Sequence, residues 1–418
     1  MSIFLEKRRL KYIGWTNEIP KHWSLQKLKF ISSLNMGQSA DTSDYSYNGI
    51  GTPFLQGKAE FGLRHPQPCI HSESAKKFAL KEDILLSVRA PVGELNIADQ
   101  KYGIGRGLCS ITPLVEVCDR DFIRYFLELA KVELLSVSTG STYEAVTIFQ
   151  VANVLCIIPP LHEQSLIASF LDRETIEIDN LVAEKEKMLA LLEEKREALI
   201  SHAVSSKENE NQGNCCLKFL TSKVGSGKTP RGGSEIYSKS GVMLIRSQNV
   251  HFAGLRLDDV VFISEEIDED MKNTRVKSGD VLLNITGASL GRCTVVTPDF
   301  PPANVNQHVS IIRCIDKMLI PQYLCYTLQG AEIRNKIWAY ENGSSREGLN
   351  FEQIASFSIR VISLEQQQKI IDYLDKETTK TDGLLGAIRE SIALLKERRS
   401  ALITAAVTGQ ISIEEMTT

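Results

Sequence analysis

The stretch LHEQSLIASFLDRETIEIDNL, from Leu161 to Leu181, recurs in the same chain as LEQQQKIIDYLDKETTKTDGL, from Leu364 to Leu384. The match continues without a gap to ALISHAV, ending at Val204, and ALITAAV, ending at Val407. An ungapped match of this length is hard to obtain by chance, so the chain contains a repeat, and a repeat determines the architecture. The identical pairs lie at one constant offset: Leu161/Leu364, Gln164/Gln367, Leu171/Leu374, Asp172/Asp375, Glu174/Glu377, Thr175/Thr378, Arg196/Arg399 and Val204/Val407.

The similarity extends upstream of these stretches with its order kept. TGSTYEAVTIFQV (139–151) corresponds to NGSSREGLNFEQI (342–354) at the same offset. Farther upstream, EDILLSVRAPVG from Glu82 corresponds to GDVLLNITGASLG from Gly279, and RGLCSI from Arg106 corresponds to QHVSII from Gln307. The chain is therefore two copies of one module.

Each copy changes character along its length. Short apolar runs alternate with Gly, Pro, Asn and Ser over most of each copy, which is typical of short strands and loops in a compact β or α+β domain. After Pro159-Pro160 and Ile362-Ser363 the composition turns to Glu, Lys, Leu and Ala, which favours helix. The predicted regions are an N-terminal segment with a first domain (1–158), a helical spacer (159–206), a linker (207–216), a second domain (217–362) and a second spacer with the C-terminal tail (363–418).

Each predicted helix carries one apolar stripe. A helix from about Thr175 to Val204 would be about 45 Å long and could not bury its stripe alone. We expect the two helices to pack against each other as an antiparallel coiled coil with pseudo-two-fold symmetry, although packing of each helix on its own domain remains an alternative. The stripe residues are Leu181, Met188, Leu192 and Leu199 in the first copy and Leu384, Ile388, Ile392, Leu395 and Leu402 in the second.

Composition limits the class of protein. The chain has 418 residues, of which 43% are hydrophobic and 24% charged, which is typical of a globular protein and excludes disorder. A net charge of -4 means that any nucleic-acid binding requires local basic surfaces or a partner. The chain contains no run of roughly 20 apolar residues, and its nine cysteines form no CxxC pair, so we expect a soluble cytoplasmic protein without a structural metal site.

Two stretches resemble catalytic motifs but lack their essential residues. VGSGKTP (224–230) has Ser222 where a phosphate-binding loop requires glycine, and Pro230 disfavours the helix that must follow. DFPPAN (299–304) has no aromatic residue after its prolines, unlike the loop that holds the base in adenine methyltransferases. The sequence therefore predicts a non-catalytic chain.

Polar residues follow several predicted strands in both copies. Arginine can bind guanine through two hydrogen bonds, and asparagine or glutamine can bind adenine in the same way, while hydroxyl groups and lysine suit phosphates. We therefore predict DNA contacts from Gln56, Lys58, Arg89, Arg106, Ser141, Thr142 and Tyr143 in the first copy, and from Lys228, Arg246, Gln248, Asn249, Thr286, Ser289, Arg292, Asn306, Gln307, His308, Ser344, Ser345 and Arg346 in the second.

Nearly the whole chain resembles the specificity subunit of a type I restriction-modification enzyme. The resemblance lies in YIGWTNEIPKHWSLQKLKF (12–30), PPLHEQ (159–164), the FLDRETIEIDNL and YLDKETTKTDGL segments, the EKREALI and ERRSALI helix ends, and VTGQI (407–411). It implies two target-recognition domains that each read one half of a split DNA sequence, with conserved helices as spacers. Because the corresponding loops differ between the copies, the two half-sites should differ.

The resemblance also implies the partners. The subunit itself would have no catalytic activity and no cofactor, and would bind double-stranded DNA, two modification subunits and two restriction subunits. The modification subunits would transfer a methyl group from S-adenosylmethionine to adenine N6, and the restriction subunits would use ATP and Mg to move and cut DNA. The alternatives are a helical scaffold with no DNA role and a nucleotide-binding protein that uses the 224–230 stretch.

Overall fold

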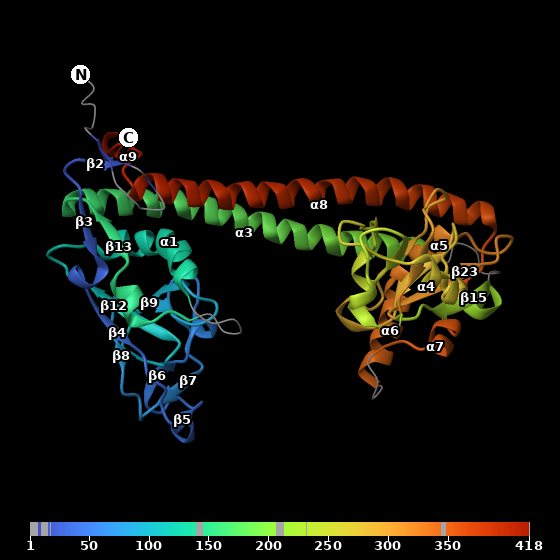
Figure 1. Cartoon of the computed structure of the whole chain (residues 1–418), viewed down its shortest axis with the longest axis horizontal. Helices are drawn as coiled ribbons and strands as arrows, with labels where there is room; N and C mark the ends of the chain where they lie inside the picture. Colours follow the sequence, from blue (N-terminus) through green and yellow to red (C-terminus); the bar gives the residue numbers. More distant parts are fainter. Residues whose placement is uncertain are drawn as a thin grey trace. The chain divides into compact units, whose positions relative to one another are not determined.

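The structure is a computed structural model that describes residues 7–9, 16, 18–138, 145–205, 213–230, 232–343 and 348–417. Contacts divide the chain into two compact units (Figure 1): unit 1 is residues 1–185 with 391–418, and unit 2 is residues 186–390. Both divisions fall inside long helices. Each unit therefore holds one domain together with part of both helices, so the predicted spacers are shared between the units.

Unit 1 is built on two sheets. The four-stranded sheet has the order β10-β9-β12-β4 and is antiparallel throughout, while in the five-stranded sheet, of order β5-β7-β6-β11-β8, strand β11 pairs in parallel with β6. All four residues of β9 are buried, as expected for a continuous apolar run. The strands are β4 (Ser32–Met36), β5 (Tyr45–Ser46), β6 (Thr52–Leu55), β7 (Ile70–Ser72), β8 (Phe78–Ala79), β9 (Ile84–Ser87), β10 (Leu95–Ile97), β11 (Tyr102–Ile104) and β12 (Leu108–Pro113). The unit also contains two small antiparallel pairs, β1 (Lys7–Arg9) with β2 (Glu18–Pro20) and β3 (Ser24–Lys27) with β13 (Leu155–Ile158).

Helices α1 (Arg120–Val137) and α2 (Ile148–Ala152) complete the first domain. Helix α1 begins because the Asp119 side chain caps it, accepting a hydrogen bond from the Phe122 N–H at 3.0 Å. Apolar residues of α1, such as Phe126, share one core with Ile111 of β12 and with Leu171 of the long helix that follows. The domain and the helix are therefore packed through a single core.

Unit 2 repeats this order. Its four-stranded sheet has the order β15-β23-β20-β21, which matches β4-β12-β9-β10 of unit 1. Its parallel pair, β16 with β22, matches the pair of β6 with β11. The strands are β14 (Asn214–Cys216), β15 (Thr221–Ser226), β16 (Val242–Ile245), β17 (Val250–His251), β18 (Gly254–Leu255), β19 (Val261–Ile263), β20 (Val281–Asn284), β21 (Cys293–Val295), β22 (Ala303–Val305), β23 (Val309–Cys314) and β24 (Ser358–Arg360). The helices are α4 (Glu265–Asp270), α5 (Pro321–Gln329), α6 (Ala331–Gly343) and α7 (Phe351–Ala355).

These matching orders confirm two tandem domains of mixed α and β content. The sequence predicted a linker that continues to residue 216. Strand β14 pairs with β24 from Asn214 onward, so the second domain begins there.

The two long helices are α3 (Leu161–Ser205) and α8 (Leu364–Val407), with 45 and 44 residues. Each begins close to the start of its predicted helical spacer, residue 159 or 363. In α3 the reason is Pro159-Pro160, since proline favours the start of a helix. A short helix, α9 (Ile413–Thr417), follows α8.

The predicted stripe is partly wrong. Leu181, Met188 and Leu384 are 47%, 49% and 45% exposed, whereas Val182, one position later, is buried. In the second copy Ile388 and Ile392 are buried as predicted. The buried positions include the β-branched residues Val182, Ile388 and Ile392 and also Leu385, a selection that the sequence alone did not distinguish.

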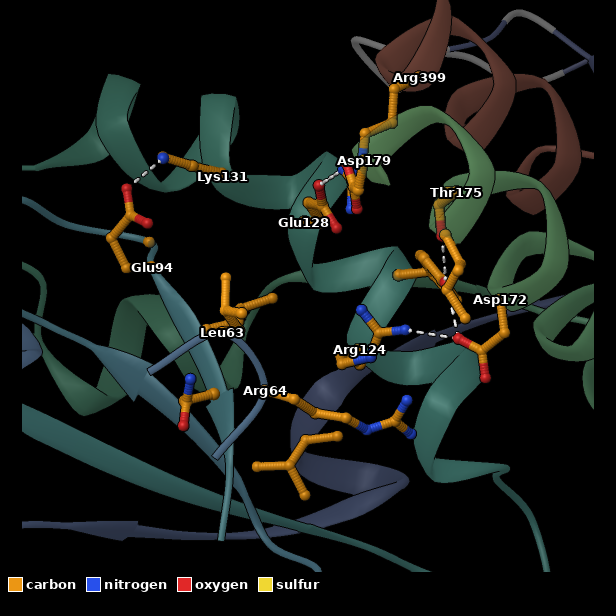
Figure 2. Close-up of a pocket in the computed structure, with 16 residues that line it drawn as sticks. Leu63, Arg64, Glu94, Arg124, Glu128, Lys131, Asp172, Thr175, Asp179 and Arg399 are labelled. Atoms are coloured by element: carbon orange, nitrogen blue, oxygen red, sulfur yellow. Dashed lines mark hydrogen bonds and ion pairs between the residues drawn. The ribbon is translucent and has the colours of Figure 1, made fainter. Parts of the chain in front are cut away.

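One repeated arginine joins both helices within each unit. In unit 1, Arg399 Nε of α8 lies 2.9 Å from Asp179 Oδ1 of α3, and the guanidinium also pairs with Glu128 of α1 (Figure 2). In unit 2, Arg196 Nε of α3 donates to Asp382 Oδ1 of α8 at 2.9 Å. Each pair thus takes its arginine from one copy of the repeat and its aspartate from the other.

Other residues that are identical in the two copies attach each helix to its domain. Gln164 Oε1 accepts from the Asp119 N–H, while its Nε2 donates to the carbonyls of Val117 and Pro159. Gln367 makes the same three bonds in unit 2, where its Oε1 accepts from the Ile320 N–H and its Nε2 donates to the carbonyls of Met318 and Ile362. Both glutamines are completely buried.

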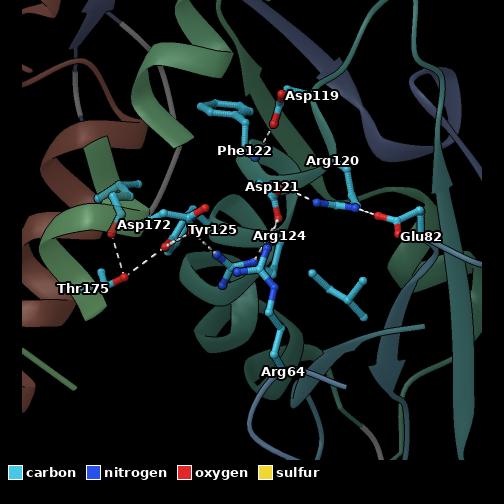
Figure 3. Close-up of polar contacts among 12 residues, drawn as sticks. Arg64, Glu82, Asp119, Arg120, Asp121, Phe122, Arg124, Tyr125, Asp172 and Thr175 are labelled. Carbon is cyan, nitrogen blue, oxygen red and sulfur yellow. Dashed lines mark hydrogen bonds and ion pairs between the residues drawn. The ribbon is translucent and has the colours of Figure 1, made fainter. Parts of the chain in front are cut away.

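A tyrosine and an aspartate form a second matched attachment. The Tyr125 hydroxyl donates to Asp172 Oδ1 at 2.7 Å and lies 3.0 Å from Thr175 Oγ1 (Figure 3). In unit 2 the Tyr326 hydroxyl donates to Asp375 Oδ1 at 2.6 Å. The repeated sequence therefore encodes how each domain is held on its helix.

Candidate nucleic-acid interface

Four predicted residues of the first copy line one pocket in unit 1, the first concavity. Gln56 follows β6, Arg89 comes shortly after β9, and Arg106 follows β11 closely, while Lys58 lies two residues beyond Gln56. Because Leu55 and Ile104 are partners in the parallel pair, the chain leaves both strands at the same edge. The concavity has a volume of about 330 Å³.

The first concavity is cationic. Lys58, Arg89 and Arg106 are exposed, and neither arginine has an ion-pair partner in the described part of the chain. Lys58 Nζ lies 4.0 Å from Glu94 Oε2. The described lining includes no carboxylate, and it adds hydroxyl groups that the sequence did not single out, from Ser39, Thr42 and Tyr45. Such a surface suits phosphate oxygens or the acceptor edge of guanine.

Glycine is required where two backbone segments meet beside this concavity. A Cβ on Gly37 would lie 2.1 Å from the carbonyl oxygen of Gly105, and a Cβ on Gly227, at the matching position of unit 2, would lie 1.6 Å from that of Val305. Gly227 belongs to the 224–230 stretch, so its role there is close packing. In the described residues the next helix is a short 3-10 helix (Gly233–Ile236), not the α-helix that a phosphate-binding loop requires.

The second concavity, in unit 2, lies at the matching strand ends. Strands β16, β20 and β22 end at Ile245, Asn284 and Val305, and the residues beyond them surround a pocket of about 420 Å³. Its lining is Ser247, Gln248, Thr286, Gly287, Ala288, Ser289, Arg292 and His308. Five predicted residues are therefore brought together, with one arginine where the first concavity has three cations.

Hydrogen bonds fix the loops of the second concavity. Thr286 Oγ1 lies 2.6 Å from His308 Nδ1. The buried Asn284 side chain donates from Nδ2 to the Ser247 carbonyl at 2.8 Å and to Ser289 Oγ at 3.0 Å, so it joins two of the loops. Asn284 is not among the predicted DNA contacts, although it begins the polar stretch NITGASLGR (284–292).

Two of the predicted contact residues are buried and hydrogen-bonded within the fold. Asn249 is completely buried, with Oδ1 accepting from the Arg246 N–H at 2.9 Å and Nδ2 donating to the Arg256 carbonyl at 2.9 Å. Asn306 is 8% exposed, and its Oδ1 accepts from the His308 N–H at 3.1 Å. Asparagine closes turns as readily as it binds bases, and these two close turns.

The remaining candidates lie apart from both concavities. Arg246 is half-buried and pairs with Asp259, while Lys228 and Gln307 are exposed outside the lining of the second concavity. The other predicted residues lie outside the described residues: Ser141, Thr142, Tyr143, Ser344, Ser345 and Arg346.

Two other features are absent from the described ranges, a metal site and a membrane-spanning helix. Within them, no three His, Cys, Asp or Glu side chains group closely enough to hold a metal ion. None of the helices described is both long and apolar enough to cross a membrane.

Comparison with known proteins identifies the family. A family model for the type I restriction modification DNA specificity domain matches residues 20–189 and again residues 216–393. A putative type I restriction enzyme MjaX specificity subunit of Methanocaldococcus jannaschii is 37% identical over 193 residues, which cover 46% of this chain and 44% of that protein. The chain thus spans less than half the length of that relative. The type I restriction enzyme MjaIX specificity subunit of the same organism is 22% identical over 431 residues and matches 96% of both proteins.

One solved structure supports the fold. It is described as the structural basis of complex assembly and conformational transition of the type I R-M system, and it is similar with a TM-score of 0.71 at 15% identity, covering 94% of this chain and 99% of that chain. At this identity the likeness concerns the fold alone. The family model, which matches both copies of the module, confirms the resemblance found in the sequence: the chain belongs to the type I restriction-modification DNA specificity family.

Proposed function

We propose that this chain is the non-catalytic subunit that selects the DNA sequence for a type I restriction-modification complex. Each concavity would read one half of a split sequence. The observation that carries the proposal is that both concavities lie at the same strand ends of the repeated module but are lined by different side chains. Two readers on one scaffold, with different chemistry, are what two different half-sites require.

The test is to co-express the chain with its cognate adenine methyltransferase and to map N6-methyladenine across the host DNA. Two short defined halves around a fixed unspecified gap would support the proposal. Methylation of one continuous motif would contradict two independent readers. If no methylation is found, testing whether the two proteins co-purify distinguishes a wrong methyltransferase partner from a wrong assignment of function. The two alternative functions, a scaffold and a nucleotide-binding protein, predict that R89A and R292A leave DNA binding unchanged.

We further propose that α3 and α8 pack as an antiparallel coiled coil that sets the gap. The support is the ion pair between Arg389 Nη2 and Glu193 Oε1, 2.7 Å apart, together with those of Arg196 and Arg399. Along α8, Asp382, Arg389 and Arg399 pair in turn with Arg196, Glu193 and Asp179 of α3, so one residue number rises along the series as the other falls. Inserting one heptad into each helix beside the Glu193–Arg389 pair would add about 10 Å while keeping the seam in register.

The expected result is a gap longer by about 3 base pairs, at 3.4 Å per base pair. An unchanged gap, with methylation retained, would contradict the role of helix length. Insertion of the same heptad into α6 provides the control, because that helix lies outside the coiled coil.

We also propose that two copies of one partner, the modification subunit, dock on the two helices, and that restriction subunits join the complex through it. S-adenosylmethionine, ATP and Mg would be used by these partners. The support is a set of exposed leucines retained at matching positions: Leu181 and Leu384 are 47% and 45% exposed, and Leu191 and Leu394 are 56% and 58% exposed. Exposed residues that are the same in both copies suit a partner that is the same at both.

The variant L191Q/L394Q should lose co-purification with the methyltransferase. Met188, which is 49% exposed but has Ser391 as its counterpart, gives the control M188Q. Undiminished co-purification of the double variant would contradict this docking surface.

A further inference from the structure

We infer that Asp259 is a specificity-determining residue of the second concavity, which acts by fixing the direction of the Gln248 amide. The inference rests on the proposed function, because it assumes that this concavity reads a DNA half-site. Asp259 lies in the loop between β18 and β19 and does not line the concavity itself. It would therefore be a positioning residue.

Three side chains of the loop after β16 converge on Asp259. Gln248 Nε2 donates to Asp259 Oδ2, and Asn249 Nδ2 donates to Asp259 Oδ1 at 2.7 Å. The third, Arg246, donates from Nη2 to the Asp259 carbonyl at 2.6 Å and lies 3.6 Å from Oδ2. One carboxylate therefore accepts hydrogen bonds both from the buried Asn249 and from the exposed Gln248 of this loop.

The chemistry of a carboxylate determines which end of the Gln248 amide it can hold. A carboxylate only accepts hydrogen bonds, whereas a glutamine amide both donates and accepts. Asp259 therefore selects the orientation in which Gln248 Nε2 points toward the carboxylate, and Gln248 Oε1 is left without a bond to Asp259. Because Gln248 is exposed and lines the concavity, that oxygen is the acceptor available for a base.

An acceptor at this position discriminates among bases. In the major groove adenine presents its N6 amino group and cytosine its N4 amino group, while guanine and thymine present carbonyl acceptors there. A Gln248 held by Asp259 should favour adenine or cytosine at one position of the half-site. A Gln248 free to turn over could also donate to guanine or thymine.

The matching loop of unit 1, as far as the structure describes it, holds no equivalent arrangement. Lys58 takes the place of Gln248 and offers only donors, and Pro68 stands just before β7 where Asp259 stands before β19. The loop is closed by Glu60, whose Oε2 accepts from the Gly57 N–H at 3.2 Å. A change at Asp259 should therefore affect one half of the target only.

The test is the variant D259N in the complete complex with its methyltransferase, with methylated sites mapped across the host DNA. Asparagine keeps the size of the side chain but can donate as well as accept, so the Gln248 amide is no longer fixed. We expect discrimination against guanine and thymine to fall about fivefold or more at one position of one half-site. The other half-site and the gap should stay unchanged. D258N is the matched control, because it removes the same charge from the neighbouring exposed residue.

A second variant keeps the inference testable if D259N weakens methylation. Q248A should relax the same position, and D259N/Q248A should relax it no further, because both changes act through one amide. If D259N methylates nothing, binding of the assembled complex to DNA with each half-site intact in turn decides. Loss confined to one half-site supports the inference, and loss of both overturns it.

Failure of the inference can be told from failure of the proposed function. A wild-type complex that produces no split motif contradicts the proposed function itself. A wild-type split motif that D259N leaves unchanged overturns only the role of Asp259.

Discussion

The two concavities occupy the same place in the repeated module yet share little of their lining. The first presents Lys58, Arg89 and Arg106, while the second presents a single arginine, Arg292, among amide and hydroxyl groups. By contrast, the residues that attach each domain to its long helix are identical in the two copies and make the same hydrogen bonds. Comparing the copies thus separates the residues that attach each domain to its helix from the residues that differ between the two concavities.

The largest expected effect concerns the matched glutamines. Q164A and Q367A should each destabilise their own unit by about 3 kcal/mol or more, because each leaves buried backbone groups without a hydrogen-bond partner at about 1–3 kcal/mol per group. Chemical unfolding followed by probes in each unit measures this. Q368A, which removes an exposed glutamine bonded only to Asp372 among described groups, should cost little. Unequal losses for Q164A and Q367A would break the equivalence of the two attachments.

The concavities should respond differently to loss of charge. R89A and R106A should weaken binding at the first half-site by about 1–3 kcal/mol each, and R292A should weaken binding at the second by a similar amount. Titration with DNA at several salt concentrations distinguishes a phosphate contact from a base contact. Loss of a phosphate contact lowers the slope of the binding constant against salt concentration by about one counterion. An effect of R89A on both half-sites would contradict separate readers.

The tyrosines give a smaller effect. Burial raises the pKa of both phenols, that of Tyr326 to about 12, so each remains protonated and donates to its aspartate at neutral pH. Y125F and Y326F should each cost about 1 kcal/mol of unfolding free energy, the net value of one hydrogen bond. In unit 1 Arg124 Nη2 also donates to Asp172, at 3.0 Å, so the Y125F loss should be the smaller of the two. Equal thermal shifts in the two variants would show that Arg124 does not compensate.

The smallest effect is chemical. Burial raises the pKa of the Cys109, Cys118 and Cys314 thiols to about 12, so they carry almost no thiolate near neutral pH. Cys69 is exposed and should be alkylated first in the folded chain, as measured by mass spectrometry after brief iodoacetamide treatment. Early labelling of Cys314 would show that unit 2 opens more readily than unit 1.

The repeat carried most of the predictable information. Identical residues such as Gln164 and Gln367 predicted two modules, and the polar loops near apolar runs marked Arg89 and Arg106, which line the first concavity, and Arg292, which lines the second. What the sequence could not give depends on contacts between distant residues. Asn249 and Gln248 are neighbours of similar chemistry, yet one is buried and one exposed, and only the fold brings Asp259 to both.

The exchange of partners around Arg196 and Arg399 has an evolutionary consequence. Arg196 of the first copy pairs with Asp382 of the second, and Arg399 of the second pairs with Asp179 of the first. A single ancestral module would have carried both the arginine and the aspartate, and could have satisfied them by associating with a second identical chain. Duplication and fusion would then convert that homodimer into one polypeptide. From that moment the two halves could diverge independently, so that a symmetric ancestor of one specificity becomes an asymmetric protein with two.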